Sequence, residues 1–124
     1  MTEQKILKSE EAISLVDRLG PSLGCDLTYY PVFPKTRKDV CAVRRLAENG
    51  STYGYDTIYL IWKNNKGIQN EELTNSRSSK DYMDINEVVE TKEDIVVKVS
   101  SGGSFSGSAW DRTYSKSKKE LGLK

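Results

Sequence analysis

The sequence predicts an α+β domain, with an N-terminal helix packed on an antiparallel β-meander that is sandwich-like or a small open barrel. One amphipathic helical pattern lies near the N-terminus, and short β-rich runs separated by polar turns follow it. A chain of 124 residues can bury a core without disulfides or metals. We therefore expect one globular domain over residues 1–114, followed by a basic, mobile tail over residues 115–124.

The helix is predicted over residues 10–19, where apolar residues recur at helical spacing and form one stripe. Ser9 is the expected N-cap, and Gly20 and Pro21 are expected to end the helix. The stripe consists of Ala12, Ile13, Leu15, Val16 and Leu19. Because a helix with one apolar stripe needs a surface to cover, we place it over one face or one end of the meander.

The first hairpin is predicted around Asn49 and Gly50, a strong signal for a tight turn. Residues 40–47 fit a strand or one face of a helix, but the turn and the β-rich run over residues 53–62 favour the strand. A two-residue turn would pair Arg44 with Tyr55 and place tyrosines and arginine on one face.

The remaining β-rich runs are short and are separated by polar turns, which is typical of a meander. Pro31 cannot donate a ladder hydrogen bond, so its strand is expected at an edge of the sheet. A polar loop is expected over residues 74–80. These strands are predicted over residues 27–33, 68–73, 82–89, 95–101 and 104–112.

The last hairpin is predicted to turn at Gly102 and Gly103, which would place Ser106 and Ser108 on the same face as the valines of the preceding strand. Small side chains let a ligand approach a sheet closely, so this strand and Trp110 form a candidate binding surface. A phosphate-binding glycine loop is the weaker alternative, because the lysine and hydroxyl of a P-loop are missing.

Histidine is absent, which excludes Ser-His-Asp and Cys-His catalysis and His-rich zinc sites. Cys25 and Cys41 are too few for a disulfide framework and wrongly spaced for zinc, so we expect two reduced thiols. No cofactor or metal is expected. The chain has neither an apolar run of roughly 18 residues nor a secretory signal pattern, so we expect a cytoplasmic protein without membrane contact.

A basic group near several tyrosines has the composition of a single-stranded nucleic-acid site, where arginines bind phosphates and aromatic rings stack on bases. The simpler interpretation is a solvated face, which the net charge of +1 favours. The group consists of Lys35, Arg37, Lys38, Arg44 and Arg45.

Two further segments could carry chemistry. Residues 71–94 hold eight acidic and three basic residues, and paired carboxylates could perform acid–base chemistry or bind a cation. Charged turns usually only keep strand edges soluble. The loop over residues 75–81, with Arg77 and Lys80, could bind a phosphate or carboxylate, or could simply connect two strands.

Seven tyrosines and two tryptophans exceed what a small core hides easily, so we expect a non-catalytic binding or interaction module. Its partner would be an unknown protein or small molecule, and an exposed edge strand could also pair two copies of the chain. The alternatives are a single-stranded nucleic-acid-binding domain and a histidine-free hydrolase or transferase that uses Asp and Glu. The candidate ligand-binding residues are Arg44, Tyr55, Arg77, Lys80, Ser106, Ser108 and Trp110.

Overall fold

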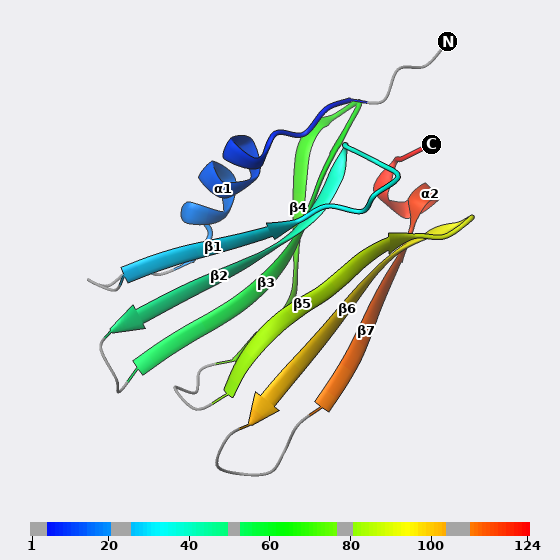
Figure 1. Ribbon diagram of the computed structural model, residues 1–124. Helices are drawn as coiled ribbons and strands as arrows, with labels where there is room; N and C mark the ends of the chain where they lie inside the picture. Colours follow the sequence, from blue (N-terminus) through cyan, green and yellow to red (C-terminus); the bar gives the residue numbers. More distant parts are fainter. Residues whose placement is uncertain (1–4, 21–25, 50–52, 77–80, 104–109) are drawn as a thin grey trace.

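The computed structural model describes residues 5–20, 26–49, 53–76, 81–103 and 110–124, and Figure 1 shows their arrangement. The four-stranded sheet has the order β1 (Asp26–Val32), β2 (Val40–Asn49), β3 (Tyr53–Asn64) and β4 (Gly67–Ser76). The three-stranded sheet has the order β5 (Asp81–Glu90), β6 (Asp94–Gly103) and β7 (Trp110–Ser117). The helices are α1 (Ser9–Asp17) and α2 (Lys118–Leu121).

The α+β fold class is confirmed. All strand pairs in both sheets are antiparallel, and the two sheets lie as separate, unclosed layers in the described part of the chain. α1 covers the outer face of the four-stranded sheet, and the three-stranded sheet packs on its other face (Figure 1). β1, with Pro31, lies at an edge of its sheet as predicted.

Both faces of the four-stranded sheet are buried, which explains why residues 40–47 showed no clear alternation. β2 is a strand, and all eight of these residues are buried because alternate side chains enter different cores. The core between the sheets includes Val40, Ala42, Ile58, Leu60, Met83 and Val97. The core beneath α1 includes Ala12, Val16, Cys41, Val43, Tyr59 and Ile61.

α1 is shorter than predicted and has a different N-cap. Lys8, not Ser9, is the N-cap, and its backbone N–H donates to the Glu11 carboxylate at 3.1 Å. The helix ends at Asp17, where the N–H groups of Arg18 and Leu19 donate to carbonyls three residues earlier. Leu19 therefore lies beyond the helix and is 37% exposed.

The predicted register of the first hairpin is wrong. Arg44 lies opposite Ile58, and Tyr55 lies opposite Ala47. Asn49 belongs to β2 and pairs with Tyr53, so the connection is one residue longer than the predicted turn and its residues, 50–52, lie outside the described part. The register shift of three residues is odd, and an odd shift exchanges the faces of a strand.

The predicted glycine turn of the last hairpin is also wrong. Gly102 and Gly103 extend β6, and Ser101 lies opposite Trp110. A tight turn of the predicted type needs a positive φ, which among the described glycines occurs at Gly67 and Gly122. Val97 and Val99 therefore lie opposite Tyr114 and Arg112.

Residues 115–124 are packed against the domain, which differs from the expected mobile tail. Residues 115–117 continue β7, and the Ser117 hydroxyl caps α2 by accepting from the Glu120 N–H at 3.0 Å. Gly122 has a φ of 69°, and the N–H groups of Gly122 and Leu123 close a Schellman motif on Lys119 and Lys118. Leu121 and Leu123 join the core between the sheets, where they are 2% and 8% exposed.

A buried ion-pair network around Arg37 holds the C-terminus. The Arg37 guanidinium contacts Asp39 at 2.8 and 2.7 Å and Glu90 at 3.0 Å, and it donates to the Lys124 carbonyl at 2.6 Å. The donors to the Glu90 carboxylate are Thr36, Arg37 and Lys118. Burial opposes ionisation of Glu90, but these donors outweigh it and lower the pKa of Glu90 to about 2.

Candidate functional site

The structure does not bring the predicted ligand-binding residues together. Arg44 faces the three-stranded sheet, whereas Tyr55 lies on the opposite face of the four-stranded sheet. Trp110 begins β7, and the Arg112 guanidinium lies 4.4 Å from the centre of its ring. The other four residues, Arg77, Lys80, Ser106 and Ser108, lie outside the described part of the chain.

The arginines of the predicted basic group do not form one basic surface. Arg37 is 3% exposed and Arg45 is 1% exposed. Arg45 donates to the Gly20 carbonyl at 3.0 Å, on the side of the sheet that α1 covers. A nucleic-acid backbone needs exposed cations, and in this group those are Lys35 and Lys38, whereas the arginines are buried.

The acidic segment is divided among separate ion pairs. Glu71 contacts Lys116, Glu87 contacts Lys98 at 2.9 Å, and Glu90 belongs to the Arg37 network. Among the described residues, no group of three or more Cys, Asp or Glu side chains is placed to hold a metal ion. Nor is any described helix long and apolar enough to cross a membrane.

One pocket, of about 570 Å³, surrounds Arg44 between β1 and β5. Arg44 donates to Asp56 at 2.8 Å and to Asp84 at 3.3 Å, and its guanidinium lies 5.0 Å from the centre of the Tyr30 ring. Arg44 is thus already bound by two carboxylates, and Asp56 also accepts from the Met83 N–H at 2.9 Å. These contacts join the two sheets, which is a structural role.

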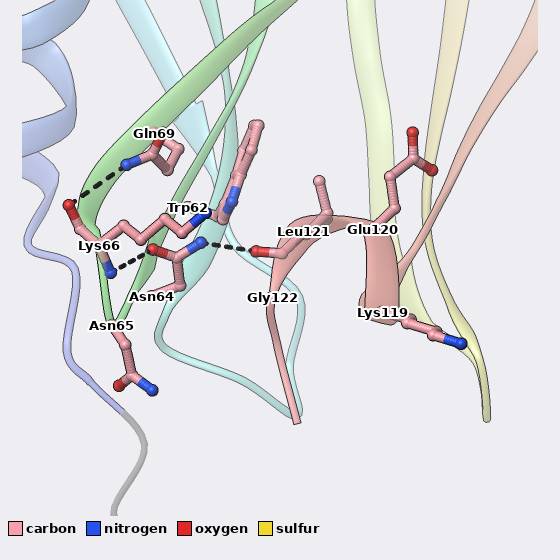
Figure 2. A pocket seen from close by; sticks show the side chains of 9 residues that line it. All are labelled: Trp62, Asn64, Asn65, Lys66, Gln69, Lys119, Glu120, Leu121 and Gly122. Carbon is pink, nitrogen blue, oxygen red and sulfur yellow. Dashed lines mark hydrogen bonds between the residues drawn. The ribbon is translucent and has the colours of Figure 1, made fainter.

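A second pocket, of about 400 Å³, lies between the β3–β4 turn and α2, and we call it the Trp62 pocket (Figure 2). Its two walls are far apart in the sequence and are held together by tertiary packing. The lining residues are Trp62, Asn64, Asn65, Lys66, Gln69, Lys119, Glu120, Leu121 and Gly122.

Asn64 fixes the two walls of the Trp62 pocket to each other. Its side-chain oxygen accepts from the Lys66 N–H at 2.8 Å, and its side-chain nitrogen donates to the Leu121 carbonyl at 2.8 Å (Figure 2). Gly67 has a φ of 103°, a conformation that favours glycine and lets β4 start directly after the turn. The pocket is therefore formed before any ligand enters.

Trp62 supplies a hydrogen-bond donor that no described residue satisfies. The residue is 9% exposed, and its indole Nε1 is buried without an acceptor in the described structure. Leaving a buried donor unpaired costs about 1–3 kcal/mol. Such groups are rare in native proteins and call for a partner; a bound water or an acceptor on a ligand would satisfy this one.

Lys66 lines the same pocket as Trp62. Figure 2 shows its side chain extended from the turn toward the Trp62 ring, whereas the Lys119 side chain points away from the pocket. Among the described residues, no carboxylate forms an ion pair with Lys66. The Lys66 ammonium on the turn and the buried indole N–H of Trp62 on β3 thus belong to the lining of one pocket.

This site was not predicted from the sequence. Asn64, Asn65 and Lys66 lie between the strands predicted over residues 53–62 and 68–73, where only a polar turn was expected, and the opposite wall was assigned to a mobile tail. The pattern of a Ser N-cap at Ser117, Glu120 at the third helical position and Gly122 as C-cap could have predicted α2. No protein-family model, curated protein or solved structure matches the chain.

Proposed function

We propose that this protein is a non-catalytic binding module that takes a small ligand in the Trp62 pocket. The observation that carries the proposal is the buried, unpaired indole N–H of Trp62. An acceptor on a ligand would form the hydrogen bond that no described residue provides.

The size and lining of the pocket support the same proposal. Its volume of about 400 Å³ falls within the range of about 300–1,000 Å³ that is typical of small-molecule sites. The Trp62 ring provides apolar surface and belongs to the buried core between the sheets. Lys66, Asn65 and Gln69 add the few polar groups that orient a ligand in such sites.

A histidine-free hydrolase or transferase is supported less well. Paired-carboxylate chemistry needs two acidic groups in one site, and Glu120 is the one carboxylate among the described residues that line the Trp62 pocket. A cytoplasmic location remains part of the proposal, supported by Cys41, which is a free and buried thiol.

The proposal can be tested by NMR with ¹⁵N-labelled protein, since the chain has two tryptophans and thus two indole N–H signals. We expect fragments that bind to shift the Trp62 indole signal and leave that of Trp110 nearly unchanged. Trp62→Phe, which keeps a ring but removes the donor, assigns the signal and should weaken binding. Fragments that bind without moving the Trp62 signal would show that the pocket is not the binding site.

A further inference from the structure

We infer that the ligand presents a carboxylate to the Trp62 pocket, with the Trp62 indole N–H and the Lys66 ammonium as its two donors. This inference rests on the function proposed above. It concerns the chemistry of the ligand, which the existence of a pocket alone does not determine.

The first step is the direction of the hydrogen bond. An indole nitrogen can only donate, so the ligand atom that reaches Trp62 Nε1 must be an acceptor. This requirement excludes an ammonium or a guanidinium as the group bound there.

The second step is the charge of that acceptor. The Lys66 ammonium extends toward Trp62 in Figure 2 and forms no ion pair with a described residue. An acceptor that receives a hydrogen bond from an ammonium binds more strongly when it is negatively charged. Lys66 is exposed at the tip of the turn, so its flexible side chain can move to admit the ligand to the buried indole N–H.

The third step separates a carboxylate from a phosphate. Phosphate sites normally use several backbone N–H groups, and at this pocket the N–H groups of Lys66 and Gly122 are already bonded. The Lys66 N–H donates to Asn64, and the Gly122 N–H donates to the Lys119 carbonyl. Two donors match the two oxygens of a carboxylate, and Glu120 on the opposite wall disfavours a dianion.

The fourth step concerns the body of the ligand. The Trp62 ring lines the pocket next to the polar turn, whereas the Leu121 side chain is 2% exposed and packs in the core between the sheets. A flat apolar body attached to the carboxylate would cover the Trp62 ring and exclude water from the two donors. The ligand class is thus a small aromatic or apolar carboxylic acid.

Benzoate, benzamide and inorganic phosphate provide probes for the test, at constant ionic strength and with both indole signals followed by NMR. Benzamide has nearly the shape of benzoate but no charge. We expect benzoate to shift the Trp62 signal with an affinity at least about fivefold higher than that of benzamide, as one charge-assisted hydrogen bond provides. Inorganic phosphate should leave the signal unchanged.

Two variants with the same change of charge make the test specific. Lys66→Gln should weaken benzoate binding about fivefold or more. Lys35→Gln removes an exposed lysine that does not line the pocket and should change the affinity less than about twofold.

The outcomes distinguish the two proposals. Equal affinities for benzoate and benzamide, or a Lys66→Gln variant that binds benzoate normally, would refute the carboxylate inference and leave the pocket as a binding site. A response to phosphate but not to benzoate would refute it as well. If none of the probes moved the Trp62 signal, the proposed function would fail together with the inference.

Discussion

Replacing Leu121 by alanine tests whether the C-terminal segment is part of the fold. Leu121 is 2% exposed and packs in the core between the sheets, so Leu121→Ala removes buried methyl groups and leaves a cavity. Buried Leu→Ala changes cost about 2–5 kcal/mol, and the terminal position of α2 favours the lower half, about 2–3 kcal/mol. At about 3–6 °C per kcal/mol for a chain of this size, the melting temperature should fall by about 6–18 °C.

Thermal unfolding followed by circular dichroism measures this loss. Lys119→Ala is the matched control, because Lys119 is an exposed residue on the same helix and should stay within about 0.5 kcal/mol of the wild type. If residues 115–124 were a mobile tail, Leu121→Ala and Lys119→Ala would have the same melting temperature. If Leu121→Ala has the same melting temperature as the wild-type protein, the docking of the C-terminal segment is refuted, and with it one wall of the Trp62 pocket.

Three further predictions follow from the buried contacts. The folded pKa of Glu90, about 2, lies below its ordinary value of 4.5, so its contribution to stability is present above about pH 4.5 and is lost as the pH falls toward 2. In an acid titration, the free energy of unfolding of Glu90→Gln should therefore depend less on pH than that of the wild-type protein. An unchanged pH dependence would contradict the ion-pair network around Arg37. Asn64→Ala should cost about 1–3 kcal/mol in urea unfolding, because it leaves the Leu121 carbonyl and the Lys66 N–H without their partner; a smaller loss than in Asn65→Ala would contradict the role of Asn64 in joining the two walls of the Trp62 pocket. Burial raises the pKa of the Cys41 thiol to about 12, so in Cys25→Ser a disulfide reagent should react only on unfolding, and rapid labelling of the native protein would contradict this burial.

The secondary structure was more predictable than the pairing of the strands. Apolar periodicity predicted α1, and Pro31 placed β1 at an edge, because both signals are local. The registers depended on the assumption that Asn49-Gly50 and Gly102-Gly103 form two-residue turns. Asn49, Gly102 and Gly103 instead extend strands, which shifted the pairing in both hairpins.

The candidate site could not be predicted because its walls meet only in the folded chain. Asn64 and the Leu121 carbonyl are 57 residues apart in the sequence, and the hydrogen bond between them depends on the packing of α2 over the end of β3. Arg44 was predicted to lie near tyrosines, and in the structure its guanidinium lies 5.0 Å from the centre of the Tyr30 ring. Its burial depends on the pairing with Asp56, which the wrong register concealed.

The decisive measurement is a crystal structure of the protein with bound benzoate. We expect the benzoate carboxylate in the Trp62 pocket, with its oxygens about 2.7–3.2 Å from Trp62 Nε1 and Lys66 Nζ. Benzoate bound elsewhere, or bound in the pocket with its carboxylate directed away from Trp62 Nε1, would refute the carboxylate inference.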